Sequence, residues 1–387
     1  MRAVVDARTF HKAVSFATTG CHHSQLLPIL NNIKIETTPN KLVLMGTDME
    51  FAVQVTMDAQ VEKEGATAVN AKQLLSLLSL MKNMGKIEIE SNGLFKLCAE
   101  EAEHEFPVIP ADEFPLFPDE PQGLSFSLPQ CTLKRMLQCT MFAMGNTTEN
   151  LTVNCVLFEI EKVPQKIGHG YRFNCVATDT YRMSIISEKI NISETTELPR
   201  FTVPSNSVHK LFKVLQEMDE EIKIVFSPSL VWLEIPHSDM TVHCAISNLG
   251  RNFPNYEHVL TLVEHPITQL KTSSVDLYQA LKKIEPHVKT IKIPRIVFDI
   301  TPECITIKFN EPDAPSEGKV KVPVVEFDGE PLQIVFNFNF IFEFVKEAKR
   351  NSAFVIMSLK GSKSCVKIDC SNEPFSYYIM PMEPPEV

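Results

Sequence analysis

Few residues in this 387-residue chain are spaced for metal binding or catalysis. The clusters Cys21-His22-His23 and His243-Cys244 have side chains that zinc sites use. Neither cluster is accompanied by a second pair at the spacing of a zinc site, so we expect no metal.

Two aspartates could serve as catalytic carboxylates. Asp48 lies in the string Gly46 to Glu50, and Asp179 lies in the similar string Ala177 to Tyr181, 131 residues later. Aspartate readily accepts hydrogen bonds from nearby backbone N–H groups, which favours a turn or capping role at a repeated position. The chain has only 13 glycines and lacks both a phosphate-binding loop and a G-x-S-x-G nucleophile motif. We therefore predict a protein that is not an enzyme and that uses no cofactor.

Two apolar strings indicate a docking groove instead. One runs from Ala177 to Met183 and the other from Tyr377 to Met382. Methionine is flexible and polarizable, which suits a surface that accepts several partners. If the two strings meet in space, the chain has a groove and no active site.

The elements that would position these strings occur three times along the chain. A strand followed by an amphipathic helix is predicted at the start, with helices over 9–16, 133–137 and 275–281. A second strand and amphipathic helix follow in each copy, over 68–75, 202–212 and 335–341. Asn or Ser at the start of each second helix predicts an N-cap. Period-2 runs such as 86–90 and 304–309 predict strands between them.

The repeat predicts an α+β fold of three domains, over residues 1–121, 124–261 and 267–387. Each domain would have two helices packed on antiparallel sheets. Proline-rich stretches at 109–121 and 262–266 are the predicted linkers, and 311–318 is a predicted loop.

Composition narrows the class of protein. Hydrophobic residues make up 44% and charged residues 22%, as in ordinary globular proteins. No apolar run reaches the length of a membrane span, and the N-terminus lacks a signal peptide. With ten scattered cysteines, this predicts a cytoplasmic protein with reduced thiols. The net charge of −11 opposes nucleic-acid binding unless Lys and Arg gather on one surface.

Six segments in order resemble a known family, the bacterial DNA polymerase III sliding clamp, or beta subunit. They are Leu27–Asn32, Gly46–Glu50, Leu128–Arg135, Val176–Met183, Phe253–Tyr256 and Tyr378–Met382. The resemblance covers essentially the whole chain. It implies three tandem clamp domains per subunit and a head-to-tail homodimer that forms a six-domain ring. The ring would encircle double-stranded DNA without sequence preference and act as a processivity factor in DNA replication. It would tether the replicative polymerase catalytic subunit and other replication and repair proteins, and a clamp loader would open it.

In this fold the helices line the lumen, and each predicted helix carries basic residues. Basic residues on exposed helix faces are also commonly just solvated; their presence in all six helices of an acidic chain favours a DNA-facing lumen. The candidates are Lys12, Lys72, Lys134, Arg135, Lys210, Lys213, Lys282, Lys283, Lys346, Lys349 and Arg350.

The resemblance also implies a pocket between the second and third domains for a short peptide with a glutamine and bulky apolar residues. Arg182 could donate a charge-assisted hydrogen bond to that peptide. Without the resemblance, Met380 and Met382 would be interpreted as core residues of an edge strand. The matching positions are Leu151, Val153, Thr178, Thr180, Tyr181, Arg182, Met183, Pro254, Val259, Tyr378, Met380, Pro381 and Met382.

Several positions depart from the family pattern. Asn150 and His258 stand where the family often has a basic residue, and Cys155 stands where glycine is usual. Cys21 to Ser24 replaces a loop that often carries Arg near DNA, and Glu383 to Val387 is an additional acidic tail beside the pocket. The alternative function is a clamp-fold scaffold that binds partners without encircling DNA.

Overall fold

The computed structural model describes residues 1–22, 26–99, 102–146, 151–164, 169–193, 198–289, 291–309 and 318–383. In these ranges strands outnumber helices, and neighbouring strands pair antiparallel. The predicted α+β class with antiparallel sheets is confirmed.

The described residues form seven α-helices, and all except the short α5 lie close to where the repeat predicts them. They are α1 Ala7–Gly20, α2 Ala71–Met81, α3 Gln130–Met141, α4 Ser205–Val214, α5 Glu257–Thr261, α6 Ser274–Val288 and α7 Phe338–Asn351, with 3-10 turns η1 Pro28–Asn31 and η2 Ala111–Glu113. The strands are β1 Arg2–Asp6, β2 Asn32–Thr38, β3 Lys41–Thr47, β4 Phe51–Asp58, β5 Gln60–Lys63, β6 Gly65–Asn70, β7 Lys86–Ser91, β8 Leu94–Ala99, β9 Ala102–Ile109, β10 Leu124–Pro129, β11 Cys155–Pro164, β12 His169–Thr178, β13 Arg182–Ile190, β14 Arg200–Pro204, β15 Glu221–Phe226, β16 Leu230–His237, β17 Met240–Ser247, β18 Thr268–Ser273, β19 Arg295–Ile300, β20 Cys304–Phe309, β21 Gly318–Asp328, β22 Leu332–Asn337, β23 Phe354–Leu359, β24 Val366–Cys370 and β25 Phe375–Ile379.

The predicted caps of the second helices are confirmed at two of three places. Asn70 accepts a hydrogen bond from the Gln73 N–H at the start of α2, and Asn337 caps α7 in the same way. The prediction is wrong for α4, which follows Pro204 and has no side-chain cap. Ser205, which follows Pro204, is the first residue of that helix rather than its N-cap.

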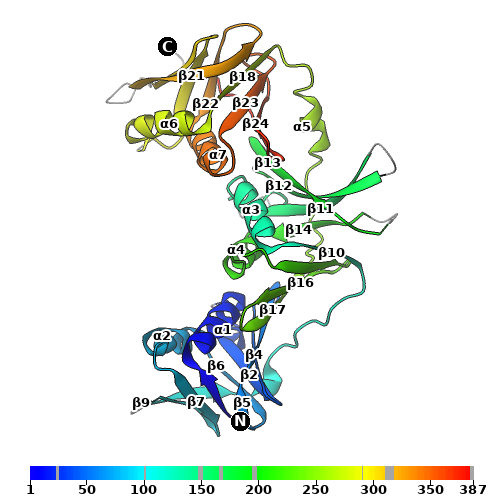
Figure 1. Ribbon diagram of the computed structural model, residues 1–387, viewed down its shortest axis with the longest axis vertical. Helices are drawn as coiled ribbons and strands as arrows, with labels where there is room; N and C mark the ends of the chain where they lie inside the picture. The colour runs from blue at the N-terminus through cyan, green and yellow to red at the C-terminus, as the bar shows by residue number, and fades with distance from the viewer. Residues whose placement is uncertain are drawn as a thin grey trace. The chain divides into compact units, whose positions relative to one another are not determined.

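The described chain forms two compact units. The first contains Met1–Arg135, Pro164–Tyr171 and Ile190–Gly250. Its main sheet has the strand order β10-β15-β16-β17-β4-β3-β2-β6-β9-β8-β7-β1-β5. Helices α1 and α2 lie side by side on this unit's strands, and α4 contacts α1 (Figure 1). Helix α1 buries Phe10, Ala13, Val14 and Ala17, the spacing of one helical face.

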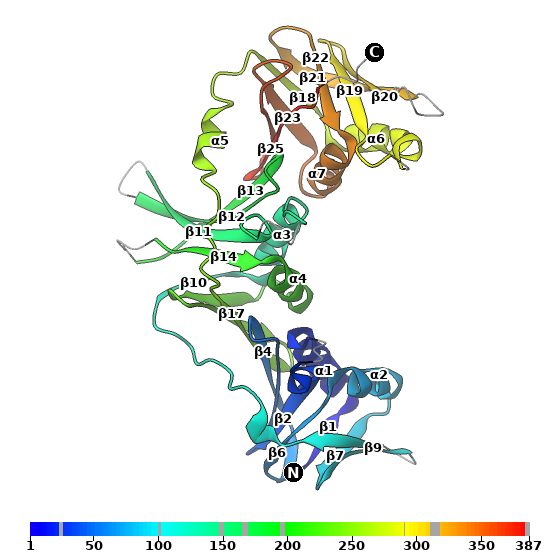
Figure 2. The same cartoon turned by 180° about the vertical axis from the view of Figure 1, so that it is seen from behind.

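The second unit contains Met136–Val163, Arg172–Lys189 and Arg251–Val387. Its strands follow the order β11-β12-β13-β25-β24-β23-β18-β21-β20-β19-β22. Helices α6 and α7 pack against each other beside these strands, as Figure 2 shows from behind. The predicted second domain, 124–261, contributes to both units, and the division into three domains stays a prediction.

Each unit contains one ladder that joins strands far apart in the sequence. In the first unit β17 pairs with β4, from Met240 opposite Met57 to Ile246 opposite Phe51. In the second unit β25 pairs with β13, from Ile379 opposite Arg182 to Phe375 opposite Ile186. Both β4 and β13 begin directly after one of the two aspartate-containing strings, so the ladders fix where these strings lie.

Candidate functional site

The first aspartate string forms a tight turn before β4. The Asp48 carboxylate accepts hydrogen bonds from the N–H groups of Glu50 at 3.0 Å and Phe51 at 2.7 Å. The Thr47 hydroxyl accepts one from the Met49 N–H and donates to the Phe51 carbonyl. Met49 has a φ of 77°, in the left-handed region that costs an L-residue about 1–2 kcal/mol. The side-chain hydrogen bonds of Thr47 and Asp48 hold the turn in this conformation.

The second string forms the same turn before β13. The Asp179 carboxylate accepts hydrogen bonds from the N–H groups of Tyr181 and Arg182, both at 3.0 Å. The Thr178 hydroxyl accepts from the Thr180 N–H and donates to the Arg182 carbonyl. Thr180 has a φ of 80°, at the place where the first turn has its left-handed residue. The predicted capping role of both aspartates at a repeated position is confirmed.

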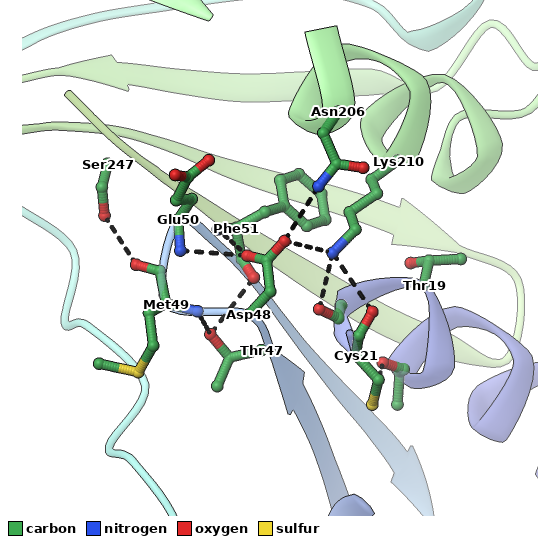
Figure 3. A network of polar contacts seen from close by, with 12 residues as sticks. Thr19, Cys21, Thr47, Asp48, Met49, Glu50, Phe51, Asn206, Lys210 and Ser247 are labelled. Atoms are coloured by element: carbon green, nitrogen blue, oxygen red, sulfur yellow. Dashed lines mark hydrogen bonds and ion pairs between the residues drawn. The ribbon is translucent and has the colours of Figure 1, made fainter. Parts of the chain in front are cut away.

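A lysine of α4 anchors the first turn (Figure 3). The Lys210 ammonium donates to the Asp48 carboxylate at 2.6 Å and to the carbonyls of Gly20 at 2.9 Å and Cys21 at 3.3 Å. Asn206 also donates to Asp48. The side chains of Lys210 and Asp48 are only 10% and 7% exposed. The prediction that Lys210 faces DNA is therefore wrong, because its charge is buried and fully engaged with the end of α1 and the turn.

Two glycines permit this close packing. A Cβ atom on Gly20 would lie 2.2 Å from the Gly46 carbonyl oxygen, and one on Gly46 would lie 2.0 Å from the Ala17 carbonyl oxygen. Any larger residue at either position would push the end of α1 away from the turn, and with it the carbonyls that Lys210 binds.

An arginine anchors the second turn. The Arg182 guanidinium donates to Asp179 at 2.9 Å, to Glu343 of α7 and to the Phe142 carbonyl at 2.8 Å. It also lies over the Phe340 ring, 4.2 Å from the centroid. All three of its nitrogens thus have partners within the protein. The expected hydrogen bond from Arg182 to a peptide is not available in this arrangement, and the side chain instead ties the turn to α7.

The structure brings eight of the predicted pocket residues together around one cavity of about 70 Å³ in the second unit. This space fits part of one apolar side chain rather than a folded ligand. Met380 and Tyr181 leave large apolar surface exposed at its edge, 42% and 65% of each residue. The lining residues are Thr178, Thr180, Tyr181, Arg182, Met183, Val259, Leu262, Cys365, Tyr378 and Met380.

Sequence reasoning missed Leu262 and Cys365. Leu262 follows Val259 by three residues at the end of α5, but this five-residue helix is too short to show a helical period in the sequence. Cys365 precedes β24 and has no local signal, since it enters the cavity only through the pairing of β24 with β25. Burial raises the pKa of the Cys365 thiol to about 11, so it packs as a small apolar residue.

Five predicted pocket residues do not line this cavity. Leu151 is exposed, whereas Val153 is buried and accepts a hydrogen bond from the Gly145 N–H. Pro254 is half-buried ahead of α5. Pro381 and Met382 are also half-buried, and the Met382 N–H donates to the Val335 carbonyl.

The remaining basic residues of the helices are at least partly exposed. Some make local contacts: Lys282 pairs with Glu285 and Arg350 pairs with Glu347, each one helical turn away. Lys134 lies over the ring of Phe212. The exposed or half-buried set is Lys12, Lys72, Lys134, Arg135, Lys213, Lys282, Lys283, Lys346, Lys349 and Arg350.

The cysteine and histidine clusters have structural roles in the described residues. Cys21 is packed at the end of α1 beside Lys210, and burial raises the pKa of its thiol to about 12. His243 stacks on Trp232 with ring centroids 5.0 Å apart. Within the described ranges no group of three His, Cys, Asp or Glu side chains is arranged to hold a metal, and His23 lies outside them.

The positions that depart from the family pattern are only partly described. Cys155 is buried at the start of β11, and His258 is exposed on α5. His22 and Glu383 are exposed. Asn150, Ser24 and the tail residues 384–387 lie outside the described residues. None of the described helices is both long and apolar enough to cross a bilayer.

Comparison with known proteins identifies the family. Residues 1–118 match the family model for the N-terminal domain of the DNA polymerase III beta subunit, and residues 127–254 match that for its central domain. The chain belongs to this family of sliding clamps. The beta sliding clamp of Proteus mirabilis is 27% identical over 368 residues, and that of Escherichia coli (strain K12) is 26% identical over 362. Each comparison covers 92% of this chain and 92% of the relative.

Solved structures of sliding clamps share the fold. The DNA polymerase sliding clamp from Bacillus subtilis superposes with a TM-score of 0.88 at 20% identity, covering 99% of both chains. The DNA polymerase III beta subunit from Thermotoga maritima gives 0.87 at 21% identity, again with 99% coverage of both. The predicted resemblance to the clamp family, and with it the clamp fold, is confirmed.

Proposed function

We propose that this chain acts as a DNA sliding clamp, a non-catalytic processivity factor that encircles double-stranded DNA without reading its sequence. Family membership and relatives named beta sliding clamps support this function over that of a scaffold without DNA. By the same relationship we expect it in the cytoplasm, bound to the replicative polymerase catalytic subunit, a clamp loader and other replication and repair proteins.

The observation that carries the ring proposal is the pattern of open strand edges. Strands β15 to β17 form one series of three hairpin-connected strands, and β23 to β25 form another. The third strand of each series pairs with the strand that begins after a Thr-Asp turn: β17 pairs with β4, and β25 pairs with β13. The corresponding third strand β9 pairs along Ala102–Pro107 only with β8, among the described residues. Strand β21 corresponds to β4, and along Gly318–Pro323 its described pairing is only with β20. Within the described residues each chain therefore has an open β9 edge and an open β21 edge, and two copies arranged head to tail would close both.

The charges on these two edges are complementary. Glu103 and Glu105 are exposed on alternate positions of β9, and the single neighbouring Lys96 pairs with both. Lys319 and Lys321 are exposed on alternate positions of β21. Opposite charges on facing strands stabilise a pairing by roughly 0.2–1 kcal/mol per pair, and like charges oppose it. This pattern favours β9 of one copy against β21 of the other over pairing of like edges.

The lumen proposal rests on the exposed basic residues of the helices. With Lys210 removed from the set, every long helix still has at least one exposed or half-buried Lys or Arg. Loose phosphate attraction of this kind is sequence-independent and allows movement along DNA.

The cavity lined by Met183, Val259 and Met380 is the proposed docking site for the apolar anchor of a partner peptide. Its lining is mainly apolar, and the guanidinium of Arg182 is engaged internally. We therefore expect recognition by shape and apolar burial, with polar contacts to the peptide coming from backbone groups and hydroxyls.

Mass measurement by light scattering tests the ring. We expect a particle of twice 43.7 kDa at micromolar concentration. The double variant Lys319→Glu/Lys321→Glu should shift the particle to monomer, and adding Glu103→Lys/Glu105→Lys should restore the dimer. The matched control Lys41→Glu/Lys63→Glu changes exposed lysines of other strands and should stay dimeric. A wild-type monomer would exclude the ring, whereas a dimer insensitive to the first double variant would exclude only this edge assignment.

A further inference from the structure

We propose that Glu343 is a positioning residue for the peptide cavity, which it does not itself line. It would act through Arg182, whose guanidinium it binds, and so hold one wall of the cavity in its binding shape. This inference rests on the proposed peptide-docking function. Glu343 lies on α7, and no pattern of apolar residues in the sequence points to it.

The wall in question is the second Thr-Asp turn with the start of β13. Five of the ten lining residues come from Thr178 to Met183. The turn contains Thr180 in a left-handed conformation, so it needs external support to keep its shape. Within the turn Asp179 supplies two backbone hydrogen bonds. Besides the pairing of β13 with β25, the Arg182 side chain, which is 6% exposed, links the turn to the rest of the unit.

Glu343 supplies the acceptor on α7 for that link. Its carboxylate accepts from Nη1 of Arg182, while Nε and Nη2 are used by Asp179 and the Phe142 carbonyl. Removing Glu343 would leave a nearly buried guanidinium nitrogen without its charged partner. With only Nε and Nη2 still bound, Arg182 would be held less firmly over the Phe340 ring that it covers.

The first unit contains a corresponding arrangement, in which a charged residue of a helix binds a Thr-Asp turn. Glu343 is the sixth residue of α7, and Lys210 is the sixth residue of α4. Both bind a Thr-Asp turn, through Asp48 in one case and Arg182 in the other. The charge that the helix residue carries depends on whether the aspartate of the turn already binds an arginine. Asp48 keeps an outer oxygen for a cation, whereas the outer oxygen of Asp179 is taken by Arg182.

The two walls of the cavity are also tied to each other. Met183 lies opposite Tyr378 in the β13–β25 ladder, and the Met380 N–H donates to the Tyr181 carbonyl at 2.9 Å. A shift of the turn would therefore move Met380 as well. Glu343 binds the wall that contains Arg182, and these strand contacts link that wall to Met380.

Peptide titration tests the proposal on the full-length protein. A fluorescent peptide with a glutamine and bulky apolar residues should bind Glu343→Ala about five- to tenfold more weakly than wild type. A loss of affinity of this size is expected when one residue affects binding through another. Glu343→Gln, which keeps an acceptor for Arg182, should recover most of this loss. Asn339→Ala, at an exposed position of the same helix, should stay within twofold. Equal affinities for wild type and Glu343→Ala would overturn the proposal.

Hydrogen exchange gives a second readout that needs no peptide. Glu343→Ala should speed exchange of the amides of 180–182 at least fivefold and leave those of 49–51 unchanged. Lys210→Met should speed exchange of the amides of 49–51 and leave those of 180–182 unchanged. Unchanged exchange at 180–182 in Glu343→Ala would refute the positioning role. A wild type that fails to bind any such peptide would refute the docking function, and the exchange result would still decide the role of Glu343 in the wall.

Discussion

Lys210 and Glu343 occupy the same position of two corresponding helices and carry opposite charges. Each is the sixth residue of its helix, and each holds a turn with the same Thr-Asp pair and hydrogen-bond pattern. Because the charges are opposite, Lys210 of α4 suits only the turn whose aspartate has no arginine partner among the described residues. Glu343 of α7 suits only the turn that contains Arg182. Exchanging the two helices would bring like charges together.

Loss of Lys210 should strongly destabilise the first unit. Lys210→Met leaves the Asp48 carboxylate buried without its cation, which costs about 3–5 kcal/mol for a broken buried pair. Urea unfolding can be followed by the single tryptophan, Trp232, which lies in this unit. Lys213→Met, on an exposed position of the same helix, should change the free energy of unfolding by less than about 0.5 kcal/mol. Similar losses for both variants would contradict the assignment.

Truncation of Met380 should weaken peptide binding. Met380→Ala removes a partly exposed side chain at the edge of the cavity, and truncation of a residue that carries binding energy costs about 1–2 kcal/mol, or roughly five- to thirtyfold in Kd. Fluorescence anisotropy with the labelled peptide measures it. Met49→Ala is the matched control, because Met49 is an exposed methionine on the corresponding turn of the first unit. Affinities equal to wild type would remove the cavity as the docking site.

Charge reversal on two helices should weaken retention on DNA. We expect the variant with Glu at Lys134, Arg135, Lys282 and Lys283 to leave loaded circular DNA at least about threefold faster, with a smaller dependence on salt, because phosphate attraction is lost. Gel filtration of clamps loaded on nicked circles measures this. A reversal at Lys41 and Lys63 changes net charge on strands alone and should retain wild-type behaviour. Unchanged retention of the helix variant would count against a basic lumen.

Acid should destabilise the first unit through His237. Burial, reinforced by the nearby Lys12 charge, lowers the pKa of His237 from 6.5 to about 4, and neither ring nitrogen has a hydrogen-bond partner among the described residues. Between these values the unfolded chain binds a proton that the folded chain does not, so stability falls as pH drops from 6.5 towards 4 by up to about 1.4 kcal/mol per pH unit. Carboxylates line the same cleft: Asp6, Asp58 and Asp239.

The control for this pH effect is His237→Phe. The imidazole stacks on Phe16 with ring centroids 4.8 Å apart, so a phenyl ring can keep the contact without titrating. Urea midpoints of the variant should decline less steeply between pH 6.5 and 4 than those of wild type. Parallel declines would assign the acid sensitivity to other groups.

Hydrophobic periodicity and capping residues predict most of the fold, because helices such as α1 and strands such as β7 carry their pattern locally. The five-residue helix α5 is too short to show a period. The same limit applies to Lys210: its neighbours in sequence resemble those of an exposed lysine, and only the arrival of Asp48, 162 residues away, buries it. Cys365 likewise reaches the cavity through strand pairing, which no local pattern encodes.

The ladders β4–β17 and β13–β25 also affect how much the amino-acid sequence can change while the fold is kept. Main-chain hydrogen bonds do not depend on side-chain identity, so a junction built from them keeps its geometry while the residues around it change. A TM-score of 0.88 at 20% identity is the expected outcome of that construction.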